Sequence, residues 1–147
     1  MSYLSTLAKN KVFVSFDWEN DRHYKFLLQA WNANPRFEFI FQDHSSSEIN
    51  SWNVGRVKAA LTNRINQATH TLVIIGAEAN KTHRDHLLIG YTNWINFEIG
   101  QSKLNRNKLV AVKLDRNFES PEELLGANAS WAMSFSEDAI IKALNEA

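Results

Sequence analysis

The chain has 147 residues, 16 Lys and Arg against 16 Asp and Glu, and no cysteine. This length is that of one ordinary domain, which buries roughly two thirds of its unfolded surface. The balanced charge gives no global attraction to nucleic acid or membranes, and the lack of cysteine excludes a disulfide scaffold and a Cys-based zinc site. With no signal-peptide pattern and no apolar run of membrane-spanning length, we expect a soluble cytoplasmic protein that binds neither nucleic acid nor membrane.

Hydrophobic patterns in the first half of the chain predict alternating strands and helices. A β-branched and aromatic run at 11–16 predicts a central strand. Helical spacing follows from Asp21, the expected N-cap, and Asn34-Pro35 ends that helix. Alternation over 37–41 favours an edge strand, and a polar, irregular stretch follows it. A second helix then carries four apolar residues in phase: Val54, Val57, Leu61 and Ile65.

The second half contains the most continuous apolar run, at 71–76, which predicts a buried parallel strand. A long polar loop over 77–90 leads into a helix that begins near Trp94. The remaining expected elements are a strand at 109–114, a helical turn at 121–125, a weak strand at 130–133 and a terminal helix capped at 136–138.

Strands that alternate with helices at this spacing indicate βαβ units and a parallel sheet. We predict one domain over residues 1–147, a flavodoxin-like three-layer sandwich with a five-stranded parallel sheet in the order 2-1-3-4-5. In such a fold the ligand crevice lies beyond the carboxyl ends of the strands. The loops at 16–22, 43–53 and 77–94 should converge there.

Several kinds of site do not fit the residues. The third strand ends in Gly76 with no phosphorylatable Asp, and the loop after the first strand is acidic and lacks the Gly of a flavin phosphate loop. Neither a dinucleotide-type Gly fingerprint nor a P-loop is present. His83 and His86 are three residues apart in a polar loop without Cys, so we predict no metal site.

The stretch from Trp94 to Glu98 is the most informative part of the sequence. The two residues are four apart, so on a helix they share one face, at the edge of an apolar stripe. We predict that Trp94 is a core residue that wedges its helix against the sheet. For Glu98 three roles stay open from position alone: a surface carboxylate, a buried ion pair or an active-site carboxylate.

The order of these motifs resembles that of TIR domains. The strand Val12-Phe13-Val14-Ser15-Phe16 before an acidic loop is similar to their first strand, and Trp94-x-x-x-Glu98 after a hydrophobic third strand is similar to their third helix. Four segments most resemble the TIR-like group that includes the ThsB sensors of bacterial Thoeris antiphage systems. They are Ser15-Phe16-Asp17, Asn20-Asp21, Ile74-Ile75-Gly76 and Trp94-x-x-x-Glu98-Ile99. The resemblance covers about residues 11–114.

This resemblance implies an NAD⁺ nucleosidase or ADP-ribosyl cyclase that makes an ADP-ribose or cyclic ADP-ribose-type signal and that can stay dormant until triggered. Glu98 would be the catalytic carboxylate, reaching a ribose from the crevice without being sealed in the core. NAD⁺ is then a substrate, and no separate cofactor is implied. Because the loop after the first strand opens onto the crevice, we expect Phe16 or Trp18 to stack on nicotinamide or adenine and Arg22 to contact the pyrophosphate. The full set of expected substrate-binding residues is Phe16, Asp17, Trp18, Arg22, Asp43 and His44.

The family also implies two kinds of partner: further copies that associate through TIR surfaces, and a downstream effector that senses the nucleotide product. The alternative interpretation is a catalytically silent TIR-like protein-interaction module. The large aromatic content, with 5 Trp and 9 Phe, leaves room for this alternative because exposed aromatic side chains mark interfaces.

Overall fold

The structure, a computed structural model, describes residues 10–34, 38–42 and 53–147. One sheet of five parallel strands has the order β2-β1-β3-β4-β5, which confirms the predicted fold class. Its strands are β1 (Asn10–Ser15), β2 (Phe39–Phe41), β3 (His70–Ile75), β4 (Lys108–Lys113) and β5 (Ser130–Ala132). The helices are α2 (Trp18–Asn32), α3 (Val54–Asn66), α4 (His86–Ile89), α5 (Trp94–Leu104), the 3₁₀ turn η2 (Glu122–Leu124) and α6 (Glu137–Glu146).

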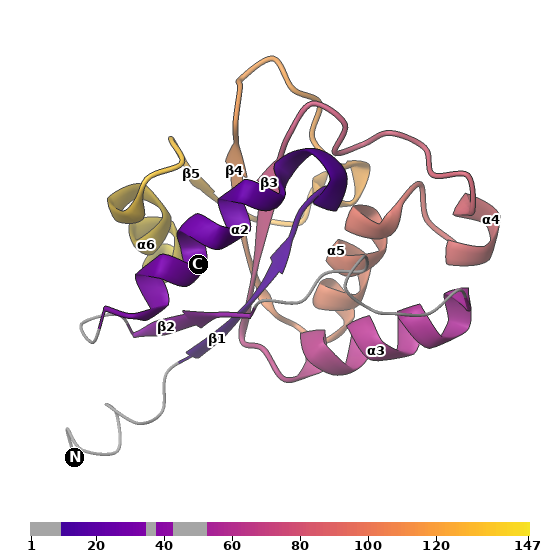
Figure 1. The fold of residues 1–147 in the computed structure, drawn as a ribbon, viewed down its shortest axis with the longest axis horizontal. Helices are drawn as coiled ribbons and strands as arrows, with labels where there is room; N and C mark the ends of the chain where they lie inside the picture. The colour runs from indigo at the N-terminus through magenta and orange to yellow at the C-terminus, as the bar shows by residue number, and fades with distance from the viewer. Residues whose placement is uncertain (1–9, 35–37, 43–52) are drawn as a thin grey trace.

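Helices cover both faces of this sheet. Helices α2 and α6 lie on one side, and α3 and α5 lie on the other, with α4 further out beyond them (Figure 1). Successive strand residues point to opposite faces, so Val12 and Val14 pack toward α6 while Phe13 packs toward α3. The strands β1, β3 and β4 are buried on both faces, as their nearly continuous apolar runs require.

The N-cap of helix α2 lies four residues before the predicted one. Asp17 caps it, because its Oδ1 accepts a hydrogen bond from Glu19 N at 3.1 Å. Asp21 N donates to Asp17 O at 2.7 Å, which places Asp21 inside the first helical turn. The prediction that Asp21 is the N-cap is therefore wrong, because Asp17 comes first after the strand and takes that position.

The edge strand β2 is shorter than predicted and is closed off by a side chain. Asn32, the last residue of α2, donates from Nδ2 to Phe41 O at 3.0 Å and accepts from Phe41 N at 2.9 Å. Its carboxamide thus takes the two bonds that a further strand would make with this residue. Such closure limits unwanted pairing at a sheet edge.

The stretch predicted as a polar loop at 77–90 contains the short helix α4. Ile89 anchors it in the core, whereas Leu87 and Leu88 are 86% and 67% exposed. One inward residue in a single turn gives no helical period in the sequence, which explains the wrong prediction. Asn93 holds the same loop, since its Nδ2 donates to Ala79 O and Lys81 O at 2.9 and 3.0 Å.

Trp94 begins α5 and packs beside the core cluster under α3, as predicted, although its ring is only partly buried. The ring lies edge-on to the rings of Phe97 and His83, with distances of 5.6 and 6.4 Å between the ring centroids. It therefore supports the start of the helix that carries Glu98.

Replacing Trp94 by Ala should lower the free energy of unfolding by about 2 kcal/mol, below the about 3–5 kcal/mol of a fully buried Trp. Denaturant unfolding would measure the change. Trp131→Ala on β5 is the matched control, because that ring is 44% exposed and its removal should cost less. Equal losses in the two variants would show that Trp94 does not anchor α5.

Candidate functional site

Glu98 lies in the second turn of α5 and faces the carboxyl end of β1. The Ser15 hydroxyl donates a 2.7 Å hydrogen bond to Glu98 Oε1, and the glutamate residue is 2% exposed. Among the described residues no ion pair includes it. The expectation that Glu98 stands open at the crevice edge is thus wrong in this conformation. Its carboxyl group is buried and held by a neutral donor.

This position makes Glu98 a weak acid. Burial raises the pKa of its carboxyl group to about 8, and the hydrogen bond from Ser15 offsets only part of that rise. At neutral pH the group is therefore mostly protonated. A carboxyl group with such a shift beside a strand terminus is a candidate functional group on physical grounds.

A chain of buried hydrogen bonds fixes the helix that carries Glu98. Asn107 Nδ2 donates to Thr71 Oγ1 at 3.3 Å, and the Thr71 and Ser102 hydroxyls are 2.7 Å apart. Ser102 Oγ then donates to the backbone oxygen of Glu98 at 2.7 Å. Gly100 permits the close approach of Tyr91 to the same helix, because an added Cβ would lie 2.5 Å from the Tyr91 hydroxyl.

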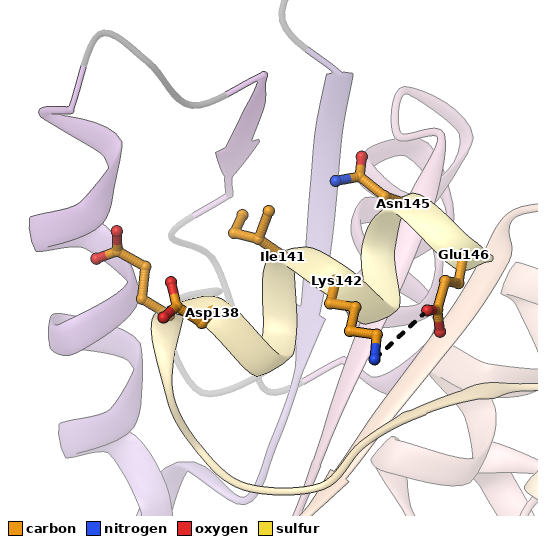
Figure 2. A pocket seen from close by; sticks show the side chains of 6 residues that line it. Asp138, Ile141, Lys142, Asn145 and Glu146 are labelled. Carbon is orange, nitrogen blue, oxygen red and sulfur yellow. Dashed lines mark ion pairs between the residues drawn. The ribbon is translucent and has the colours of Figure 1, made fainter.

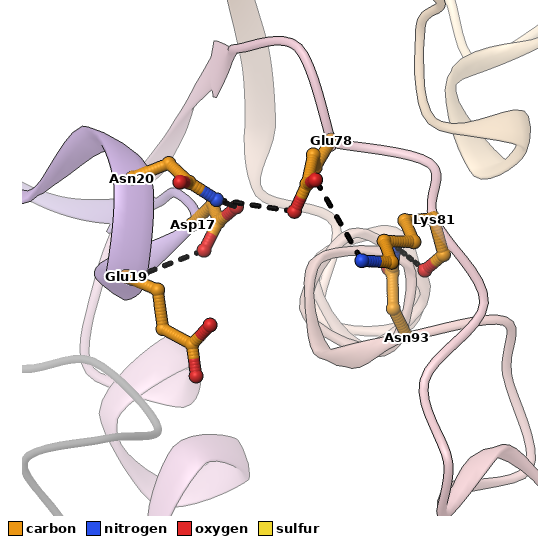
Figure 3. Close-up of polar contacts among 6 residues, drawn as sticks. All are labelled: Asp17, Glu19, Asn20, Glu78, Lys81 and Asn93. Atoms are coloured by element: carbon orange, nitrogen blue, oxygen red, sulfur yellow. Dashed lines mark hydrogen bonds and ion pairs between the residues drawn. The ribbon is translucent and has the colours of Figure 1, made fainter.

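Polar side chains join the loops after β1 and β3 (Figure 3). Asn20 Nδ2 donates to Asp17 Oδ2 at 2.6 Å and to Glu78 Oε2 at 3.1 Å. Glu78 also pairs with Lys81 at 3.6 Å. Asn20 therefore separates two carboxylates that would otherwise repel each other across the strand ends.

Asp21 is a second buried carboxyl group near these strand ends. It is 7% exposed, and its Oδ2 atom has no hydrogen-bond partner. Burial raises its pKa to about 6, and the nearby charges of Asp17 and Glu78 add to the rise. The carboxyl lies against Gly76 at the end of β3, where an added Cβ would stand 2.0 Å from Oδ2.

The change Gly76→Ala should lower the free energy of unfolding by about 1–3 kcal/mol, because the methyl group overlaps the Asp21 carboxyl. Chemical denaturation checks this. Adding Asp21→Ala to the variant removes the overlapping group and should recover part of the loss. A Gly76→Ala protein as stable as the parent would contradict the packing described for Asp21.

The predicted substrate-binding residues differ in how accessible they are to a ligand at the ends of the strands. Phe16 is 6% exposed and packs in the core, so it does not reach a ligand without moving. Trp18 is partly buried, and Arg22 lies over its ring at 5.9 Å. Asp17 is the helix cap described above. Asp43 and His44 lie outside the described residues.

Two surface hollows lie elsewhere. One, of about 450 Å³, is lined by residues of α6, whose Lys142 and Glu146 are 4.0 Å apart (Figure 2). The other, of about 650 Å³, lies between α2, β2 and α3. The described residues that line these two hollows do not include Glu98.

The strand order, together with a glutamate on α5 held against the end of β1, defines a TIR-like α/β domain. The family model for the TIR-like domain of the Thoeris protein ThsB matches residues 13–118, and the chain belongs to this antiphage-defence family. No curated protein matches the chain. In the part of the chain that the structure describes, no helix has the length and apolar character to cross a membrane.

Proposed function

We propose that this domain cleaves the bond between nicotinamide and ribose in NAD⁺, with Glu98 as the catalytic residue. The observation that supports it most is the buried Glu98 carboxyl, hydrogen-bonded to Ser15 at the carboxyl end of β1, in a chain of the ThsB family. In parallel α/β sheets this end of the strands is where ligands bind.

The reaction suits a single carboxylate. Nicotinamide leaves as a neutral molecule, so no general acid is required, and the ribose passes through an oxocarbenium-like transition state. An ionised Glu98 that faces the ribose would stabilise this charge more than it stabilises the ground state. Attack by water then gives ADP-ribose, whereas attack by an internal hydroxyl or an adenine nitrogen gives a cyclic product.

The geometry offers a physical reason for low activity before a trigger. Glu98 is covered, and its pKa of about 8 leaves it mostly neutral at pH 7. Activation would uncover the carboxyl, and the positive nicotinamide ring of NAD⁺ would favour its ionised form. The trigger therefore acts by exposing and ionising one side chain.

For substrate binding we propose Trp18 as the stacking residue and Arg22 as a contact for the pyrophosphate. The two side chains lie together at the start of α2. Asp17 borders the same strand end, and Asp43 and His44 stay in the proposal on sequence position alone. We further propose that the product acts on a nucleotide-sensing effector.

The proposal is tested by incubating the purified protein with NAD⁺, alone and with lysate of phage-infected cells, and separating all products by chromatography. Release of nicotinamide with an equal amount of ADP-ribose or a cyclic isomer, in the triggered sample, is the expected result. A lysate sample without the protein controls for other NAD⁺-consuming enzymes. Unchanged NAD⁺ under triggering conditions that produce a defence response would contradict it.

The second candidate function is a catalytically silent interaction module, which the exposed pair Leu87 and Leu88 on α4 favours. Exposed neighbouring apolar side chains of this size mark contact surfaces. This function predicts association that Leu88→Ser weakens, with no NAD⁺ turnover at any stage. Analytical ultracentrifugation measures the association of the parent and Leu88→Ser proteins. Together with the chromatography of NAD⁺ products, it distinguishes the interaction module from the enzyme.

A further inference from the structure

Ser15 is a buried polar residue at a position in β1 that suits an apolar one. The three strand residues before it are buried and apolar: Val12, Phe13 and Val14. Ser15 is itself fully buried and pairs in register with Val73 of β3, which belongs to an apolar cluster that includes residues of α5. A β-branched residue suits such a position better than Ser does, so the packing of the sheet does not explain the hydroxyl.

The partner of this hydroxyl is the Glu98 carboxyl. Ser15 Oγ donates to Glu98 Oε1 at 2.7 Å, and neither side chain forms another hydrogen bond within the described part of the chain. Phe97 and Ile99, the neighbours of Glu98 on α5, are buried apolar residues, so the bond lies in surroundings of low dielectric. Stability does not require this pair, because replacing both partners by apolar groups of the same shape can be nearly neutral.

Charged side chains do not balance the charge of Glu98. The helical elements packed against α5 carry Arg56, Lys58, Arg64, Glu122 and Glu123, and α5 itself carries Lys103. The strands packed against it carry Lys11, His70, Lys108 and Lys113, of which only Lys113 lies at the carboxyl end of its strand. Among the residues that the structure describes, none of these forms an ion pair with Glu98. Burial and the hydrogen bond from Ser15 are the two causes of the shift in the pKa of Glu98.

From these observations we propose that Ser15 is a positioning residue for the reaction, whose hydroxyl orients the Glu98 carboxyl and favours its negatively charged form. The inference rests on the proposed function, in which Glu98 acts as a carboxylate. A carboxylate has no proton to donate, so Ser15 is the donor in the ionised state. This charge-assisted bond is roughly twice as strong as the bond to a neutral acid. It therefore lowers the pKa of Glu98 against the larger rise caused by burial.

Ser15 acts on the reaction through Glu98 and does not need to touch the substrate. Without the hydroxyl, the buried carboxyl has no donor and ionises only at higher pH. At a pH below the pKa, fewer protein molecules then carry the charged group, and kcat/KM falls in the same proportion. Above the shifted pKa the charged form is restored, so most of the rate should return.

The first measurement follows the ionisation of Glu98 itself, through its carboxyl ¹³C NMR signal in the untriggered protein. The signal is assigned by its absence from the Glu98→Gln protein. We expect the parent midpoint near pH 8 and the Ser15→Ala midpoint at least about one pH unit higher. Ser102→Ala is the matched control, because it removes an equally buried hydroxyl that donates to the backbone oxygen of Glu98. Its midpoint should equal that of the parent.

The second measurement is the pH dependence of kcat/KM for NAD⁺ cleavage by the untriggered protein. The midpoint for Ser15→Ala should move upward by the same amount as the NMR midpoint. At pH 7 its kcat/KM should therefore fall at least about tenfold, with a smaller change on the plateau at high pH. A purely structural role would lower the whole profile without moving its midpoint.

Equal NMR midpoints in the parent and Ser15→Ala proteins would overturn the inference, and so would an equal upward shift in Ser102→Ala. A raised midpoint in Ser15→Ala with no NAD⁺ cleavage by either protein would instead contradict the proposed function, because the NMR titration needs no activity. If Ser15→Ala does not fold, Ser15→Cys takes its place. A thiol is only a weak donor, so this midpoint should also rise, and an unchanged one would overturn the inference.

Discussion

Replacing Glu98 by Gln should lower the rate of triggered NAD⁺ cleavage at least about 10²-fold, equivalent to about 2.7 kcal/mol of transition-state stabilisation. Gln keeps the size of the side chain and an oxygen that accepts the hydrogen bond from Ser15. It lacks the negative charge that opposes the oxocarbenium ion. The rate is measured as nicotinamide released per minute by parent and variant under the same trigger.

Glu146→Gln is the matched control for this experiment. It makes the same chemical change on the surface of α6, where the Glu146 side chain is 59% exposed and lies 4.0 Å from Lys142. The control should cleave NAD⁺ at the parent rate. A Glu98→Gln protein that also keeps the parent rate would remove the catalytic role of Glu98 and favour the interaction module.

The same substitution should change how stability depends on pH. The pKa of Glu98 is raised from 4.5 to about 8 in the folded protein, so the folded state holds a proton that the unfolded chain releases. The stability linked to this proton is fully present below pH 4.5 and is lost as pH rises toward 8. Between pH 4.5 and 7 the loss is about 3 kcal/mol, since each unit corresponds to about 1.36 kcal/mol.

Gln does not titrate, so the Glu98→Gln protein does not show this fall in the free energy of unfolding as pH rises. The free energy of unfolding of the variant, minus that of the parent, should therefore rise by about 3 kcal/mol from pH 4.5 to 7. Urea unfolding at several pH values measures the difference, and comparing the two proteins removes the contribution of every other titrating group. A difference that stays constant with pH would mean that Glu98 is not a buried, protonated acid.

The strand order was predictable because long-range hydrophobic patterns carry it, and the family was predictable because short motifs, such as Trp94-x-x-x-Glu98, resemble those of TIR domains. The apolar runs at 71–76 and 109–114 could only be buried strands, and their spacing implied the crossover helices. Local boundaries were less predictable. Asp17 and Asp21 are both good N-caps, and only the length of β1 decides between them.

The state of Glu98 was beyond sequence reasoning for a different reason. Strand alternation places Ser15 on the same face as Phe13, but the sequence does not say which helix residue covers it. That depends on how closely α5 approaches the sheet, where the Ser102 hydroxyl lies 2.7 Å from the hydroxyl of Thr71 on β3. The contact between Asn32 and the backbone of Phe41 likewise depends on where α2 ends against β2.

The pH dependence of kcat/KM for the low NAD⁺ cleavage before any trigger tests the central claim most directly, because this quantity reports the ionisation of the free enzyme, in which Glu98 is still buried. If Glu98 must ionise from its buried, protonated state, kcat/KM should rise with pH, reach half its plateau near the pKa of about 8 and level off above it. The small residual activity of Glu98→Gln should not show that rise. A parent profile that is flat or falls between about pH 6 and 8 would contradict the account.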